Sequence, residues 1–202
     1  FIVYGDDSTY ENVDKLVSDE RVRNADIIFG VGGGRAVDTC KVVADKLDKP
    51  LFTFPTLGSN CAAVTAICVM YNEDHTFKDY YYLDKPADHT FIDTQIIAES
   101  PEDLFWAGIG DALSKECEAV YSSQGVNLDH TPLMGVGISK VCTEPLIKYG
   151  KKALEDCKNN TESEELKQVV LDIIISTGLV SNLTTTENDY YYNSSLAHAF
   201  YN

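Results

Sequence analysis

The stretch GVGGGRAVDTCK, from Gly30 to Lys41, decides the fold of this chain. The apolar run DIIFGV at 26–31 precedes the glycines and is typical of a buried strand. After the glycines, apolar residues recur at helical spacing over 37–47. Backbone N–H groups at a helix start form a binding site for phosphate when glycines leave them uncovered. The stretch therefore predicts a strand, a tight turn and a helix, with a candidate anion site at the turn.

The glycine run by itself leaves two interpretations open. It departs from the dinucleotide fingerprint G-x-G-x-x-G at the third glycine, where Arg35 stands. Glycine also serves any turn that needs a positive φ, so a simple tight turn explains the run equally well. Arg35 would either help to neutralise a bound ligand or face solvent.

Residues 1–100 alternate short apolar runs with helical patterns, which is typical of strands joined by crossover helices. Ser8 and Glu11 have the spacing of a capping box, which predicts a helix after them. We expect further strands at 1–5, 51–54 and 90–93 and a hairpin of strands at 66–71 and 77–82. The pattern predicts an α/β domain with a parallel sheet plus a hairpin.

Residues 101–202 show only helical periodicity. We expect helices at 102–122, 132–149 and 162–177, the last one capped by Thr161 with Glu164. The chain is therefore predicted to consist of an α/β domain over 1–100 followed by an all-α domain over 101–202.

The composition narrows the possible partners. The chain has 202 residues, 44% of them hydrophobic, which is enough to fold around a sizeable core. Its 32 acidic and 16 basic residues give a net charge of −16, which would repel a phosphate backbone. No apolar run approaches the roughly 18 residues that cross a bilayer. We expect no nucleic-acid partner and no membrane partner.

The six cysteines contain no C-x-x-C pair, and most of them fall in apolar periodic segments, where a free thiol behaves as a small hydrophobe. Three N-x-[ST] triplets, beginning at Asn159, Asn182 and Asn193, would suit a secreted glycoprotein, but such triplets also arise by chance. The cysteine pattern favours a cytoplasmic protein.

Four segments in order resemble one known family. Gly30–Lys41 is similar to the G-G-G-[ST/K]-x-x-D-x-x-K signature of the iron-containing alcohol dehydrogenase and glycerol dehydrogenase superfamily. PTLGS at 55–59, GIGDAL at 108–113 and LAHAFYN at 196–202 resemble three later segments of the same superfamily. The resemblance is strongest on the glycerol dehydrogenase and 2-hydroxycarboxylate dehydrogenase side.

The resemblance implies a dehydroquinate synthase-like architecture. It makes residues 1–100 an NAD(P)-binding domain whose first βα unit is missing. Residues 101–202 become a helical metal-binding domain whose C-terminal part is missing, so we expect a chain truncated at both ends.

The resemblance also implies a set of cofactor-binding residues in the first domain. They are Gly32, Gly33, Gly34, Asp38, Thr56, Ser59, Thr65, Ile67 and Tyr71. Two alternatives stay open: Asp38 and Lys41 would form a solvated helix face, and Ile67 and Tyr71 would pack on one face of the hairpin.

In the second domain the resemblance implies that Asp111 and His198 are ligands of one divalent metal. A carboxylate and an imidazole suit Zn, Fe, Ni or Mn equally. The alternatives are an ion pair of Asp111 with Lys115 on a wet helix face, and a purely structural histidine. Lys115 stands where the iron-dependent branch has a histidine, and Tyr201 where many relatives have a second one. The third ligand is expected beyond the last residue.

Cys61 stands where glycerol dehydrogenases carry a substrate-binding aspartate. A thiol would not repel an anion, so Cys61 is a candidate substrate residue and shifts the expected substrate from glycerol towards a 2-oxo or 2-hydroxy acid. We expect hydride transfer between NAD or NADP and a small alcohol, polyol or 2-hydroxy acid, in a homo-oligomer, with no catalytic residues beyond the metal ligands. The alternatives are a non-catalytic nucleotide-binding module and a 3-dehydroquinate synthase-like lyase.

Overall fold

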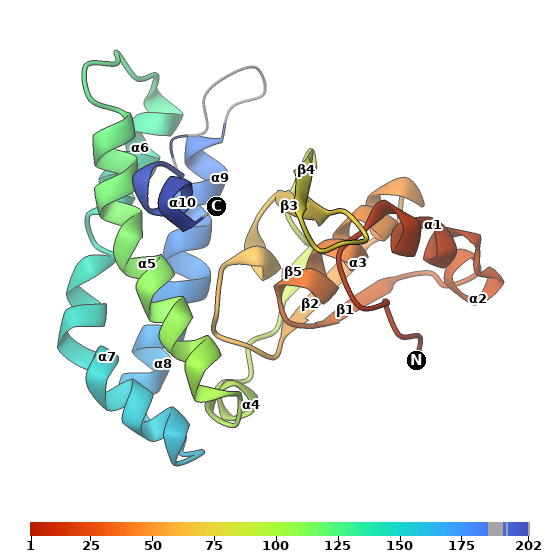
Figure 1. The fold of residues 1–202 in the computed structure, drawn as a ribbon, viewed down its shortest axis with the longest axis horizontal. Coiled ribbons are helices and arrows are strands. Elements are labelled where there is room, and N and C mark those ends of the chain that lie inside the picture. Colours follow the sequence, from red (N-terminus) through yellow and green to blue (C-terminus); the bar gives the residue numbers. More distant parts are fainter. Residues whose placement is uncertain (186–191, 193, 202) are drawn as a thin grey trace. The chain divides into compact units, whose positions relative to one another are not determined.

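The computed structural model describes residues 1–185, 192 and 194–201, which form two compact units (Figure 1). The first, called the α/β unit here, comprises Phe1–Leu57 and Ala62–Asp93. The second, called the helical unit, comprises Gly58–Cys61 and Thr94–Asn202. A short segment at 58–61 therefore belongs with the helices that follow it much later in the chain.

The α/β unit is built on a three-stranded parallel sheet in the order β1-β2-β5. Its strands are β1 (Ile28–Gly32), β2 (Leu51–Pro55) and the two-residue β5 (His89–Thr90). Helix α3 (Gly34–Lys46) makes the crossover from β1 to β2 (Figure 1). Gly32 pairs with Pro55, so both strands end at the same edge of the sheet.

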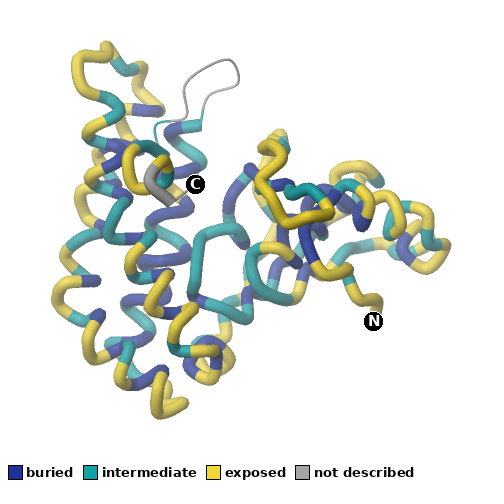
Figure 2. Tube along the Cα trace, in the orientation of Figure 1, coloured by how far each residue is buried: buried dark blue, intermediate teal, exposed yellow. Residues whose placement is uncertain are grey.

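An antiparallel hairpin of β3 (Ile67–Tyr71) and β4 (Phe77–Tyr82) completes this unit, as the sequence predicts. Two short helices, α1 (Tyr10–Ser18) and α2 (Glu20–Arg23), and the single turn η1 (Ala62–Val64) accompany it. Buried residues from α1, α2, α3 and β3 form its core: Val13, Val22, Val42, Val43, Cys68 and Met70. Figure 2 shows in dark blue where buried residues lie along the chain.

The two faces of the sheet differ. Gly30 is buried, and a Cβ there would lie 3.1 Å from the Cβ of Cys40 on α3. Side chains alternate between the faces of a strand, so Phe29 and Val31 point to the opposite face, where both are 55% exposed. Phe29 stacks on Phe52 with ring centroids 5.7 Å apart, and the face opposite α3 therefore carries an aromatic cluster.

The helical unit contains seven α-helices among its described residues, and a π-helical turn, η2 (Asp172–Ser176) (Figure 1). The helices are α4 (Thr94–Ala98), α5 (Glu102–Ser122), α6 (His130–Ser139), α7 (Thr143–Lys158), α8 (Glu164–Leu171), α9 (Thr177–Thr184) and α10 (Leu196–Tyr201). Packing between the helices buries Ala119, Val136, Cys142 and Val180. The predicted order of an α/β part followed by an all-helical part is confirmed.

Three predicted details of the first unit are wrong. The strand predicted over 90–93 is the two-residue β5, and residues 91–93 are not in a strand. Residues 1–5 form no strand, because no neighbouring strand in the described part of the unit offers them a ladder; Val3 is 83% exposed. The N-cap of α1 is Thr9, whose hydroxyl accepts a hydrogen bond from Asn12 N at 3.1 Å, and not Ser8.

The helix predicted over 132–149 is two helices, α6 and α7. Pro145 has no N–H to donate to Val141, and its ring would collide with that carbonyl, so an unbroken helix is disfavoured. The last long helix begins after Ser163, whose hydroxyl accepts from Leu166 N at 3.0 Å, and not after Thr161.

The helical run Glu164–Thr184 is, by length and composition, long and apolar enough to cross a membrane, and the sequence pattern did not predict such a run. The sequence pattern predicts that this helix ends at 177. In the structure η2 joins α8 to α9 without a break, so the helical run continues to Thr184. Its most apolar 18-residue window is 56% buried, which is also a property of a core helix in a globular protein.

Candidate active site

The glycine turn lies where β1 meets α3. Gly32 has φ +147, a conformation that side chains rarely adopt, and a Cβ there would lie 2.7 Å from the Cβ of Ala36. Gly33 is the N-cap of α3 and provides no side-chain hydrogen bond to the helix. The first N–H groups of a helix have no intrahelical partner, so those of α3 are left uncapped for an anion.

Thr56 follows β2 at the same edge, and its N–H donates to Gly32 O at 3.1 Å. Gly32, Gly33, Gly34 and Thr56 are thus brought together at the carboxyl ends of two parallel strands. Open α/β sheets bind ligands at that edge. The arrangement suits the predicted phosphate contact, which stays a prediction.

Arg35 neither points freely into this turn nor is fully solvated. Its Nη1 lies 3.0 Å from Oδ2 of Asp7, whose side chain is 1% exposed. The guanidinium also lies over the ring of Tyr71, 4.8 Å from its centroid. Its charge is therefore already paired within the protein, although half of the side chain remains exposed.

Asp38 and Lys41 form a buried ion pair, so the alternative of a solvated helix face is wrong. Lys41 Nζ lies 2.8 Å from Oδ1 of Asp38, and the two side chains are 0% and 7% exposed. Lys41 also donates to Ile67 O at 2.6 Å, and Asp38 Oδ2 accepts from Val69 N at 3.0 Å. The pair fastens β3 to α3.

Two more of the predicted cofactor residues lie in this buried network. The hydroxyl of Thr65 is 3.3 Å from Lys41 Nζ, and Thr65 and Ile67 are 2% and 9% exposed. Asp38, Thr65 and Ile67 thus have structural partners within the unit. Their contact with a cofactor stays a prediction.

The segment with Ser59 and Cys61 packs in the helical unit against α5. A Cβ on Gly108 would lie 1.9 Å from Gly58 O, so this glycine permits backbone contact that no other residue allows. Gly110, two residues further along α5, has open space beside it. Of the two glycines that precede Asp111, one therefore admits a neighbouring segment and the other faces open space. Cys61 is partly buried and is not in a disulfide.

Asp111 and His198 meet although they lie far apart in the sequence. Asp111 is on α5 and His198 on α10, and Nε2 of His198 lies 3.7 Å from Oδ1 of Asp111. Their side chains are 28% and 38% exposed, so the pair is accessible. The alternative of a wet ion pair with Lys115 is wrong, because Lys115 is 2% exposed and inside the unit.

Sequence reasoning missed Glu118, about two helical turns after Asp111. Its side chain is 3% exposed, and its Oε2 lies 2.8 Å from Nδ1 of His198. Burial by itself would raise the pKa of Glu118, but hydrogen bonds from His198 and from Ser195 N lower it to about 2. The available signal was spacing: Asp111, Ser114 and Glu118 share one face of α5.

The donor set fits a divalent cation. A tetrahedral zinc that binds nitrogen and oxygen at about 2.1 Å holds the two atoms about 3.4 Å apart, close to the observed separation. No group of three or more His, Cys, Asp or Glu side chains suited to a metal occurs among the described residues. Asp111 and His198 are the two predicted ligands among the described residues, and their binding of a metal stays a prediction.

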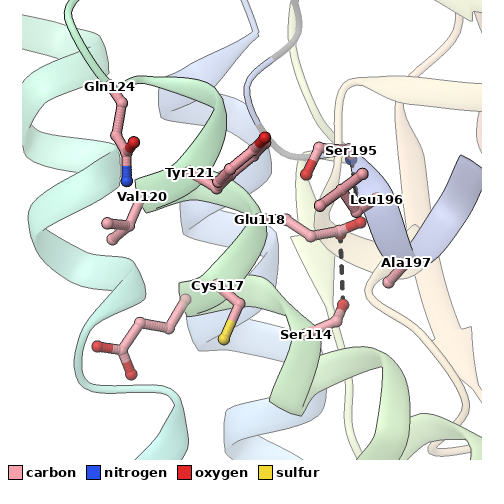
Figure 3. A pocket seen from close by; sticks show the side chains of 10 residues that line it. Ser114, Cys117, Glu118, Val120, Tyr121, Gln124, Ser195, Leu196 and Ala197 are labelled. Atoms are coloured by element: carbon pink, nitrogen blue, oxygen red, sulfur yellow. Dashed lines mark hydrogen bonds between the residues drawn. The ribbon is translucent and has the colours of Figure 1, made fainter.

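A pocket of about 490 Å³ opens between α5 and the start of α10 (Figure 3). Ser114 and Glu118 line it and are joined by a hydrogen bond of 3.3 Å, but Asp111 and His198 do not line it. The other lining residues are Glu116, Cys117, Val120, Tyr121, Gln124, Ser195, Leu196 and Ala197. The pocket therefore borders Glu118, whose carboxylate contacts His198, and does not include the side chains of Asp111 and His198.

Residues 2–94 match the family model of the iron-containing alcohol dehydrogenases. Together with the fold, this match confirms the predicted resemblance to that superfamily. A crystal structure of a probable glycerol dehydrogenase from Sinorhizobium meliloti superposes with a TM-score of 0.81 at 26% identity and covers 89% of this chain and 52% of its own.

Within the superfamily, the chain is similar to enzymes for both expected substrate classes. Glycerol dehydrogenase of Thermotoga maritima is 32% identical over 177 residues, which are 86% of this chain and 48% of the relative. Hydroxycarboxylate dehydrogenase A of Escherichia coli is also 32% identical over 177 residues, which are 87% and 48%. The chain spans about half the length of the curated relatives it matches.

Proposed function

We propose that this chain is the part of an NAD(P)- and metal-dependent oxidoreductase that interconverts a small alcohol, polyol or 2-hydroxy acid with its carbonyl form. One observation carries the proposal. The fold brings Asp111 and His198 together as an accessible carboxylate and imidazole, in a chain whose other unit presents an uncapped glycine turn.

The described residues have separate tasks in this reaction. The N–H groups at the start of α3 would bind the diphosphate of the dinucleotide. Asp111 and His198 would hold the cation, and both ligand types suit Zn, Fe, Ni or Mn. When bound, such a cation supplies a Lewis acid that lowers the pKa of the substrate hydroxyl, and the nicotinamide supplies the hydride acceptor. Glu118 would accept a hydrogen bond from Nδ1–H of His198, which in the neutral imidazole leaves Nε2 free to bind.

Two features bear on the substrate. One relative named for glycerol and one named for hydroxycarboxylate are each 32% identical to this chain over 177 residues. A thiol at Cys61 in place of a carboxylate would leave a site that tolerates an anionic substrate. We therefore propose a 2-hydroxy acid ahead of glycerol. None of the six cysteines, all of them among the described residues, forms a disulfide, which suits a reducing compartment, and we propose a cytoplasmic enzyme.

The test is reduction of NAD or NADP by the full-length protein with a panel of diols, glycerol and 2-hydroxy acids. We expect turnover that a chelator abolishes and Zn, Fe, Ni or Mn restores. Asp111→Asn and His198→Gln should each lower kcat/KM by about 1,000-fold or more, because Lewis-acid stabilisation contributes several kcal/mol.

Asp103→Asn is the matched control, because Asp103 is an exposed carboxylate in the first turn of the same helix. It should retain wild-type kinetics. Absence of turnover with every substrate would contradict the oxidoreductase and favour a non-catalytic nucleotide-binding module. Phosphate elimination from a cyclising substrate would favour the lyase.

A further inference from the structure

The buried carboxylate of Glu118 is the centre of a partly buried hydrogen-bond network between α5 and α10. Oε1 accepts from Ser195 N at 3.0 Å and from His198 N at 3.2 Å. Nδ1 of His198 lies 3.0 Å from Oε1 and 2.8 Å from Oε2. Ser114 Oγ, one turn earlier on α5, lies 3.3 Å from Oε2 and holds the carboxylate from the other side.

The two backbone contacts fix the start of α10. The first N–H groups of a helix have no intrahelical partners, and a negative charge beside them is favoured by the helix dipole. Glu118 provides the hydrogen-bond acceptor and the negative charge, although it lies 80 residues before His198. Glu118 therefore acts as an N-terminal cap of α10 from a different helix, and this contact positions His198 relative to Asp111.

The side-chain contact fixes the state of the imidazole. A carboxylate accepts hydrogen bonds, and both oxygens of Glu118 lie within 3.0 Å of Nδ1, so this contact favours the tautomer with the proton on Nδ1. In the neutral form of that tautomer Nε2 keeps its lone pair, and this is the atom that lies 3.7 Å from Asp111. Histidines that bind metals commonly donate their other N–H to a carboxylate, which fixes the tautomer and makes the ligand more basic.

We propose that Glu118 is a positioning residue, which holds His198 in the tautomer and orientation that bind a divalent cation together with Asp111. This inference rests on the proposed function, because it assigns the cation to Asp111 and His198. Glu118 itself lies on the Nδ1 side of the ring, away from the proposed ligand atom.

Glu118→Gln is the first test, because it keeps the size of the side chain and removes its charge. Glu116→Gln is the matched control: Glu116 is on the same helix, but its carboxylate accepts from Thr143 Oγ1 at 2.6 Å. We would measure Co²⁺ and Zn²⁺ affinity by calorimetry and the Co²⁺ absorption spectrum in the full-length protein. Loss of a carboxylate partner of a metal-bound histidine typically weakens metal affinity about 10- to 100-fold.

We expect that loss, and an altered Co²⁺ spectrum, for Glu118→Gln and wild-type values for Glu116→Gln. If Glu118→Gln does not fold by circular dichroism, Glu118→Asp keeps the charge at a shorter reach and should show a smaller loss. Wild-type affinity and spectrum in the folded Glu118 variant would overturn the positioning role alone. Absence of Co²⁺ binding by the wild type would overturn the proposed function.

A second readout needs no metal. The ¹⁵N spectrum of the histidine rings, with His198 assigned by its loss in His198→Gln, reports which ring nitrogen carries the proton. We expect His198 protonated at Nδ1 in the wild type and in Glu116→Gln, and a mixture of tautomers in Glu118→Gln. Equal tautomer populations in all three proteins would contradict the role of Glu118.

Discussion

The α/β unit and the helical unit both bury charged side chains, but over very different distances along the chain. In the α/β unit, Asp38 and Lys41 are three residues apart on α3 and fasten the neighbouring strand β3. In the helical unit, Glu118 pairs with His198, 80 residues later. The first arrangement is built into one short motif, whereas the second exists only when α10 lies against α5.

The two networks therefore differ in role: the Asp38–Lys41 pair supports the fold near the glycine turn, whereas the Glu118–His198 pair includes a residue of the candidate site. In the α/β unit, a local network whose charges are enclosed joins β3 to α3, the helix that begins at the glycine turn. In the helical unit, Asp111 and His198 are accessible, whereas the carboxylate of Glu118, which contacts His198, is buried. We expect substitutions in the first network to affect folding above all, and those in the second to affect ligand binding.

The largest effect on folding is expected from Lys41→Met. This change leaves Asp38 buried without its partner, and breaking a buried ion pair typically costs about 3–5 kcal/mol in the free energy of unfolding. Lys46→Met is the control on the same helix: its ion pair with Asp14 is on the surface, and such pairs contribute about 0–1 kcal/mol. Urea unfolding measures both. Equal losses for the two variants would contradict the importance of the buried network.

A smaller effect is expected from Gly108→Ala. The added Cβ would meet Gly58 O at 1.9 Å, so backbone must move. Overpacking of this kind costs about 1–3 kcal/mol, occasionally more. Gly110→Ala, on the same helix with open space around it, should instead gain up to about 1 kcal/mol from helix propensity. Thermal unfolding of the two variants should give opposite signs, and a stabilised Gly108→Ala would show that segment 58–61 does not pack on α5.

The smallest of the three effects depends on pH. Burial raises the pKa of Asp172 from its ordinary 3.8 to about 6, with Ser176 opposing. Because the folded state favours the protonated acid, this group stabilises the fold below pH 3.8, and that contribution disappears as the pH rises through 6. The shift corresponds to at most about 3 kcal/mol, and we expect about half of that after relaxation.

Asp172→Asn stays neutral at every pH, so it should be more stable than the wild type at pH 7 and equal to it at pH 3.5. Urea unfolding at both pH values measures this difference. Glu118 behaves in the opposite way: its pKa is lowered to about 2 from 4.5, so its contribution is present above pH 4.5 and is lost as the pH falls towards 2. If Asp172→Asn and the wild type differed in stability by the same amount at pH 7 and at pH 3.5, the assignment of this pH dependence to Asp172 would be contradicted.

The sequence was sufficient where the decisive contacts are local. The strand, glycine turn and helix around Gly30–Lys41 follow from period and composition, and α5 has the predicted bounds. The hairpin was also predictable from two β-rich runs separated by a polar turn. Residues 1–5 show the limit: an apolar run becomes a strand only if a partner strand is present.

The candidate site was predictable in its parts and not in its assembly. Asp111 and His198 could be named from the family resemblance, but nothing in the sequence brings α10 to α5. Glu118 is a charged residue in the middle of an amphipathic helix, where a solvated position is the usual expectation. Its role becomes visible when Ser195 N and the ring of His198 are found against it.

The most direct test of the proposed function is isotope transfer in the full-length protein with Zn²⁺ and NAD⁺. The substrates would be glycerol and a 2-hydroxy acid, each deuterated at the carbinol carbon. Mass spectrometry should find that deuterium in the nicotinamide reduced by the wild type. It should find no deuterium transfer with Asp111→Asn or with the wild type after chelation. Reduced cofactor without deuterium, or deuterium transfer that persists in Asp111→Asn, would contradict metal-dependent hydride transfer at this site.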